Sequence, residues 1–139
     1  MDPLHLAHLI LVSTWGGLVL GESVLELTAR DEAGRRHAAR LHYWMDVLLE
    51  LPLILAVLAT GAILAWRAWP LGTLHWIKIG AALVAVSLNL YCVGVVFARR
   101  KREDDARSVE RLSKRVRLSG LGIPFAMLAA YVGLIYFRR

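Results

Sequence analysis

The chain has 139 residues, of which 58 % are hydrophobic, and a formal net charge of +6 at pH 7. Its apolar residues form long runs without a polar face, which argues against a small soluble helical domain. Nearly all of the positive charge falls in two short segments, where membrane topology and anionic headgroups account for it, so nucleic-acid binding is not expected. Cys92 is the single cysteine of the sequence and therefore cannot form an internal disulfide.

Four apolar segments are long enough to cross a bilayer, which takes about 20 residues. They cover residues 4–28, 42–65, 73–98 and 118–137. We expect an all-α fold in which residues 1–139 form a single transmembrane domain, an integral membrane four-helix bundle with up-down-up-down topology. The start of the chain lacks the basic region of a signal peptide, so we expect the first span to remain in the mature protein. A homo-oligomer surrounded by membrane lipid is the expected assembly.

The basic residues predict an orientation for this bundle. Segments 29–41 and 99–117 connect spans and are rich in Arg and Lys, whereas residues 1–8 contain neither. Because basic connections stay in the cytoplasm, both segments are expected to be cytoplasmic loops and both termini to lie outside. The expected location is the bacterial inner (cytoplasmic) membrane. Within the second loop, apolar residues at helical spacing predict a helical extension along the membrane surface.

Polar residues in the first span predict two separate sites. His8, Trp15 and Glu22 recur at steps of seven, which keeps their side chains on one helix face. A helix rises about 1.5 Å per residue, so His8 and Glu22 are about 21 Å apart and cannot share one small site. Charged groups inside a span cost about 2.5–3.5 kcal/mol and usually face the bundle interior. We therefore expect one site near each end of the bundle.

The cytoplasmic-side site is predicted from the second span, where His42, Asp46 and Glu50 follow one another at steps of four. Glu22 of the first span comes level with them in an up-down bundle. One interpretation is a salt-bridge network in which the carboxylates pair with Arg40 and loop arginines. Another is a metal site, since imidazole and carboxylate suit divalent ions, and a third is a proton relay or quinone contact. The corresponding function is a non-enzymatic membrane subunit or a metal or proton transporter.

The outer site is predicted from the first and third spans. His8 is a candidate axial ligand of a haem, and His75 is a possible second ligand across the bundle. Trp15 is expected to pack on the macrocycle. Lys78 is expected either near a propionate or extended toward the outer interface.

Several short motifs resemble known membrane families. "HLILVSTWGGL", residues 8–18, and "LHWIKIGAAL", residues 74–83, resemble the first and third helices of the HemJ-type protoporphyrinogen oxidases. "GIPFAML", residues 122–128, is similar to the proline-containing fourth helix of that family, and the CopD-like copper-resistance membrane domains share the general plan. "DVLLELPLILAVLATGAIL", residues 46–64, is similar to the second helix of a family of small bacterial integral membrane proteins of unknown function.

The HemJ-type resemblance implies a haem b or related porphyrin between the first and third helices, with His8 as ligand and Lys78 near the porphyrin. It also implies electron transfer to quinone, or porphyrin oxidation, as the activity. The chain departs from that family at Cys92, and at Glu26 and Leu27, where the family has histidines. These departures concern the oxidase activity and leave haem binding as the expectation. Whether the protein is also an enzyme, a HemJ-like haem-dependent oxidoreductase, is left open.

Overall fold

The computed structural model describes residues 2–137, and that part of the chain is helical, with no strand in it. The helices are α1 (Pro3–Thr28), α2 (Glu32–Met45), α3 (Leu51–Arg67), α4 (Thr73–Arg100), α5 (Ala106–Ser119) and α6 (Ile123–Phe137). A π-helical turn, Asp46–Glu50, joins α2 to α3, and a 3-10 turn, Gly120–Gly122, joins α5 to α6. The expected all-α class is confirmed. Of the predicted domain 1–139, residues 1 and 138–139 lie outside the described part.

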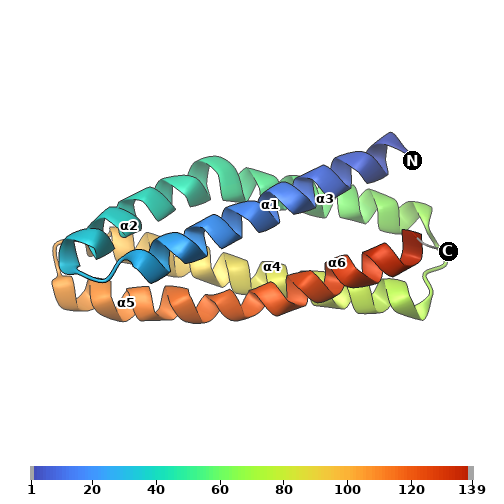
Figure 1. The fold of residues 1–139 in the computed structure, drawn as a ribbon. Helices are drawn as coiled ribbons and strands as arrows, with labels where there is room; N and C mark the ends of the chain where they lie inside the picture. Colours follow the sequence, from blue (N-terminus) through green and yellow to red (C-terminus); the bar gives the residue numbers. More distant parts are fainter. Residues whose placement is uncertain (1, 138–139) are drawn as a thin grey trace.

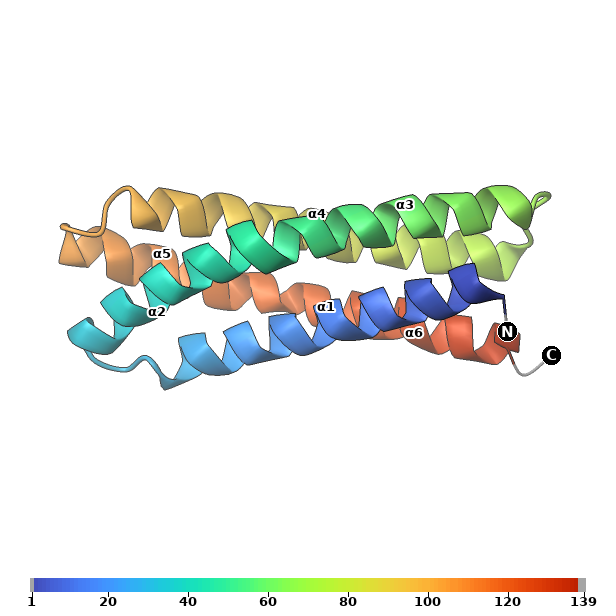
Figure 2. The ribbon, with the colours of Figure 1, turned by 90° about the horizontal axis from the view of Figure 1, so that it is seen from above.

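The chain forms four long helical segments that lie side by side as a bundle (Figures 1 and 2). When α2 with α3, and α5 with α6, are each taken as one continuous helix, the described part of the chain has four helices long and apolar enough to cross a membrane: Pro3–Thr28, Glu32–Arg67, Thr73–Arg100 and Ala106–Gly133. Figure 1 shows both ends of the chain at one end of the bundle, which we call the outer end. The connections 29–31 and 101–105 lie at the opposite end, which we call the inner end. Successive segments therefore run in opposite directions.

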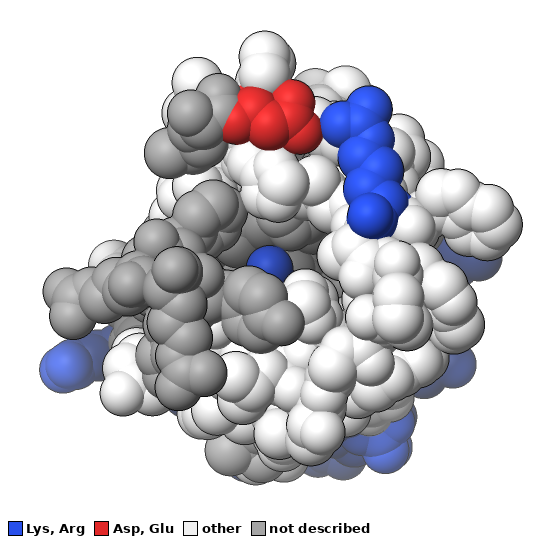
Figure 3. Space-filling model, turned by 90° about the vertical axis from the view of Figure 1, so that its right-hand side faces the viewer, with Lys and Arg blue, Asp and Glu red and all other residues white. Residues whose placement is uncertain are grey.

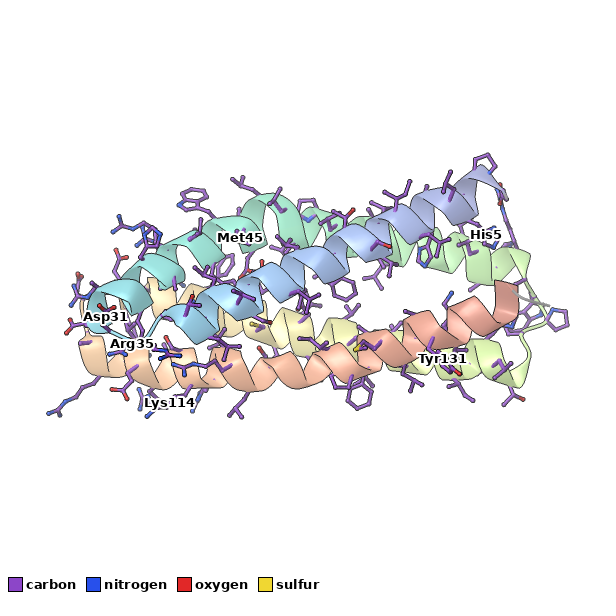
Figure 4. All side chains as sticks on the ribbon, viewed as in Figure 1. His5, Asp31, Arg35, Met45, Lys114 and Tyr131 are labelled. Carbon is purple, nitrogen blue, oxygen red and sulfur yellow. The ribbon has the colours of Figure 1, made fainter. Side chains whose placement is uncertain are left out.

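The two connections at the inner end are shorter than the predicted loops 29–41 and 99–117, because most of both segments is helical. Asp31 begins α2 by accepting a hydrogen bond from the backbone N–H of Gly34, and Asp105 caps α5 in the same manner. Both are favoured helix-capping residues. Figure 4 shows charged side chains of α2 and α5, among them Arg35 and Lys114, gathered at this end.

Helix α5 was expected to lie along the membrane surface, but it continues into α6 and packs against α4. Its apolar face is spaced at helical intervals and enters the core of the bundle. The core cluster at this end consists of Cys92, Val95, Val96, Leu112 and Val116. The apolar face of α5 is therefore covered by protein and has no need of a lipid surface.

The π-helical turn explains how the second long segment passes through Pro52 without ending. Proline has no backbone N–H and its ring crowds the carbonyl four residues earlier, so an ordinary α-helix is disrupted there. In this chain the N–H of Leu51 bonds to the carbonyl of Asp46, which widens the turn. Such turns occur frequently at functional sites. Asp46 and Glu50, the two ends of the turn, are both buried.

The outside of the bundle is strongly apolar. Val24, Leu55 and Met127 belong to three different helices and are 60–68 % exposed. Soluble monomers rarely present continuous apolar surfaces of this kind, whereas lipid-facing helices do. Charged side chains, by contrast, occur inside the bundle near its inner end. This distribution fits the four helices that are able to span a membrane.

Candidate functional site

A group of buried charged side chains lies inside the bundle toward the inner end, and we call it the inner cluster. Every member is at most 4 % exposed. The members are Glu22 and Glu26 of α1, His42 of α2, Asp46 and Glu50 of the π-helical turn, and Arg99 of α4. Charged groups are almost never fully buried unless they are paired or bind an ion, so each contact in this cluster needs a physical account.

Arg99 and Glu26 form a buried bidentate ion pair. The two terminal nitrogens of Arg99 donate to the two carboxylate oxygens of Glu26 at 2.9 and 2.6 Å. One of these nitrogens also donates to the hydroxyl of Ser113 on α5, at 3.0 Å. Bidentate Arg–carboxylate pairs are strong and geometrically specific. The pair therefore ties α1, α4 and α5 together and fixes the position of the Glu26 carboxylate.

Glu26 in turn orients His42. The Nδ1 atom of His42 lies 2.8 Å from Oε1 of Glu26, and because the carboxylate can only accept, Nδ1 carries the proton. In a neutral imidazole the lone pair then lies on Nε2. That atom faces Glu22 Oε2 at 3.7 Å and Asp46 Oδ1 at 3.5 Å, distances too long for hydrogen bonds. A carboxylate that fixes the tautomer of a histidine is the usual partner of a metal-ligating imidazole.

The atoms that surround His42 Nε2 are acceptors without donors. Within residues 2–137, no hydrogen bond reaches His42 Nε2, Glu22 Oε1 or either carboxylate oxygen of Asp46. Leaving a buried polar atom unsatisfied costs about 1–3 kcal/mol, and more when it is charged. Each of these three side chains offers one atom that could ligate a metal ion, and the three atoms all lie within 4.8 Å of one another. Four ligands placed about 2.1 Å from a zinc-like ion in tetrahedral geometry lie roughly 3.4 Å apart, close to the two distances from Nε2.

Trp15 belongs to the edge of the inner cluster. Its indole N–H donates to Oε1 of Glu50 at 3.3 Å, and both side chains are buried. The ring packs in a core cluster with Ile54, Ala85 and Val86. Sequence spacing predicted that Trp15 packs on a porphyrin in the outer site, but its polar atom and its ring are both engaged elsewhere. These contacts place Trp15 beside the inner cluster, and its macrocycle-packing role stays a prediction.

His8 is held by α3 at the outer half of the bundle. Its Nδ1 lies 2.8 Å from the hydroxyl of Thr60, and that hydroxyl donates to the carbonyl of Ala56 at 2.8 Å. Since the hydroxyl proton is used, the hydroxyl accepts from His8, and the lone pair of the ring lies on Nε2. The ring lies so close to Gly61 that an added Cβ there would come within 3.3 Å of it. The lone pair on His8 Nε2 is the group that an axial ligand of a haem needs.

The other two predicted haem residues lie on α4. His75 and Lys78 are half-buried and one helical turn apart. The Lys78 amine extends to α6, where an added Cβ on Gly133 would lie 3.4 Å from it. Figure 3, which views the outer end of the bundle, shows one basic group near the centre of this end. His8 therefore contacts α3 and the Lys78 amine lies beside α6, whereas Trp15 contacts Glu50 of the inner cluster.

A cavity of about 280 Å³ adjoins the inner cluster. It lies between α1, α4 and the junction of α5 and α6. Glu22, Glu26 and His42 contribute to one wall, and Asn89 and Cys92 of α4 contribute to another. The cluster is therefore buried without being sealed on every side.

Arg99 is the member of the cluster that the sequence did not single out. It was counted among the loop arginines that were expected, together with Arg40, to pair with the carboxylates, and Arg40 itself is exposed. A signal for Arg99 was present in the helical periodicity of α4. Cys92 and Val96 are buried four residues apart, and a further step of three on the same face reaches Arg99.

No protein-family model, curated protein or solved structure matches this chain. The resemblance to the HemJ-type family therefore stays a prediction. Function has to be inferred from the side chains of the inner cluster and from the cavity beside it.

Proposed function

We propose that this chain is an integral membrane protein that binds a divalent transition-metal cation inside the bundle, with Glu22, His42 and Asp46 as ligands. Mn²⁺, Fe²⁺ and Zn²⁺ suit a donor set of one imidazole and two carboxylates. This corresponds to the metal-binding alternative predicted from the sequence. It takes the inner cluster as the functional site and makes no use of a porphyrin.

One observation carries this proposal. The His42 side chain is buried, and its Nε2 has no hydrogen bond among the described residues. Nε2 faces the carboxylates of Glu22 and Asp46, of which Glu22 Oε1 and both Asp46 oxygens also lack a hydrogen-bond partner. Glu26 and Arg99 hold the imidazole in the tautomer that a metal requires. A cation is the species that converging acceptors can bind. Its presence would turn several unsatisfied buried atoms into ligands.

The charge of the cluster supports the same conclusion. Four carboxylates are buried there, and Arg99 is the one Lys or Arg that is buried within residues 2–137. Arg99 balances Glu26, which leaves Glu22, Asp46 and Glu50 without a cationic side chain. An uncompensated carboxylate in an apolar interior is costly, so the site needs either protons or a metal ion. The histidine lone pair among the oxygens favours the metal ion.

The membrane setting is part of the proposal. The excess of Arg and Lys at the inner end supports a cytoplasmic location for that end, with both termini outside, in the bacterial inner membrane. The metal site would then lie near the cytoplasmic side of the bilayer. Membrane lipid surrounds the bundle, and further copies of the chain are its proposed partners.

Metal content and affinity test the proposal. The protein is purified in dodecyl maltoside without chelator, analysed for bound metals, stripped, and titrated with Mn²⁺. We expect about one ion per chain, with binding lost in Asp46→Asn and His42→Gln, which nearly preserve side-chain volume. Glu32→Gln, in an exposed ion pair with Arg36, is the matched control and should bind as the unaltered protein does. Unchanged affinity in the Asp46 and His42 variants would refute the proposed site.

Haem binding at the outer site is the second candidate function. The hydrogen bond between His8 and Thr60 favours it, because it leaves His8 Nε2 available to an iron ion. With haem b bound, the group would supply one-electron chemistry, with quinone or a porphyrin as partner, and His75 and Lys78 would line its site. The test is an absorption spectrum before and after haem is supplied. A Soret band lost in His8→Ala supports this candidate, and a protein that stays colourless contradicts it.

A further inference from the structure

The cavity beside the inner cluster has walls of opposite hydrogen-bonding character. The wall formed by α1 and α2 presents the carboxylates of Glu22 and Glu26 and the His42 ring. The opposite wall, formed by α4 and the end of α5, presents Asn89 and Arg117, which carry N–H donors. The first wall attracts cations, whereas the second attracts oxygen acceptors.

Asn89 has an amide nitrogen that needs an acceptor. Its Nδ2 atom is buried and has no hydrogen-bond partner in the described part of the chain. Arg117 is exposed at the rim and adds a positive charge that can attract an anion into the cavity. An oxygen atom placed in the cavity would satisfy Asn89.

The proposed metal site is incomplete on the side of the cavity. Glu22, His42 and Asp46 supply three protein ligands, and metal sites with three protein ligands keep an open position for water or another molecule. Glu22 and His42 both line the cavity, so the open position faces it. An oxygen there would contact the cation on one side and the Asn89 amide on the other.

We propose that this cavity binds a carboxylate or phosphate group, whose oxygen completes the coordination of the cation and accepts a hydrogen bond from Asn89. The inference rests on the proposed function, because the cation supplies half of the attraction. The remaining lining includes Val19, Leu27 and Ile123, which offer an apolar path for an alkyl chain. The volume of about 280 Å³ suits a head group or a small anion.

Thermodynamic linkage tests this inference. Two ligands that contact each other when both are bound raise each other's affinity for the protein by the same factor. The affinity for Mn²⁺ is measured in dodecyl maltoside with chloride, with acetate, and with decanoate. We expect the carboxylates to tighten Mn²⁺ binding by about 5- to 150-fold, the usual range of such coupling. Asn89→Leu should lose this enhancement and keep its affinity in chloride. Ser87→Leu, on an exposed position of α4, is the control and should keep both.

The outcomes separate the two proposals. Mn²⁺ binding that carboxylates do not tighten overturns the inference and leaves the metal site intact. The absence of any Mn²⁺ binding overturns both. A stronger effect of decanoate than of acetate identifies a membrane amphiphile as the source of the anion, and an equal effect identifies a small soluble anion. If Asn89→Leu does not fold, Arg117→Gln provides the second test, and an undiminished enhancement there argues against an anion in the cavity.

Discussion

The pair of Arg99 and Glu26 gives the sharpest prediction about stability. Replacing Arg99 by Met removes two charge-assisted hydrogen bonds to Glu26 and one to Ser113, and leaves a buried carboxylate without its partner. Breaking a buried ion pair from one side typically costs about 3–5 kcal/mol. We therefore expect the free energy of unfolding of Arg99→Met to fall by about that amount. Arg36→Met removes an exposed pair with Glu32 and should cost no more than about 0.5 kcal/mol.

The assay is unfolding by a denaturing detergent, followed by circular dichroism in mixed micelles. Glu26→Gln and the double variant complete a mutant cycle, which isolates the coupling between the two side chains. Two charge-assisted bonds predict a coupling of about 2–3 kcal/mol, so the double variant should be more stable than the sum of the single losses indicates. If the two losses are additive, or if Arg99→Met resembles Arg36→Met, the account of this pair is refuted.

Three further predictions concern hydrogen bonds at Trp15, Thr60 and Asp105. Trp15→Phe leaves Glu50 without its indole donor and should cost about 1–3 kcal/mol in detergent unfolding, with any haem spectrum unchanged; a lost Soret band would return Trp15 to the outer site. Thr60→Val should cost a similar amount by leaving the buried face of His8 unpaired, whereas Thr60→Ser should restore it. Hydrogen bonds, first from Ser108, hold the pKa of the Asp105 carboxyl below its ordinary 3.8. Asp105→Ala should therefore destabilise α5 at pH 7, and its difference from the unaltered protein should vanish as the pH falls below 3.8; a constant difference would contradict the capping role.

The long apolar runs predicted the helices well, because the need to satisfy every backbone group in lipid leaves a helix as the simple solution. The polar starts of α2 and α5 were harder to predict. Residues 32–41 contain many charged side chains, and their charge indicated a loop. Residues 106–117 were expected to be helical, but along the membrane surface and not inside the bundle. Their helical form depends on the caps at Asp31 and Asp105 and on packing against neighbouring helices, which hydropathy does not report.

The inner cluster was predicted in part. Steps of four placed His42, Asp46 and Glu50 on one stripe, and all three are buried together. Trp15 could not be placed by spacing, since it is seven residues from His8 and seven from Glu22. Its indole N–H donates to the buried carboxylate of Glu50, and this contact places Trp15 beside the inner cluster. Arg99 was not distinguished from the other loop arginines, because a basic residue at a span end is ordinarily a topology signal, and only tertiary contacts identify Glu26 as its partner.

The coordination of Mn²⁺ tests the central claim most directly. Electron spin-echo spectroscopy of the Mn²⁺-loaded protein detects a ligating imidazole through its nitrogen nucleus, and it can be repeated on His42→Gln and on His8→Gln. The account predicts one histidine nitrogen bound to the ion, retained in His8→Gln and absent from His42→Gln, which loses the ion together with the ligand. A nitrogen signal that survives in His42→Gln, or an unaltered protein that binds no Mn²⁺, would contradict a metal site in the inner cluster.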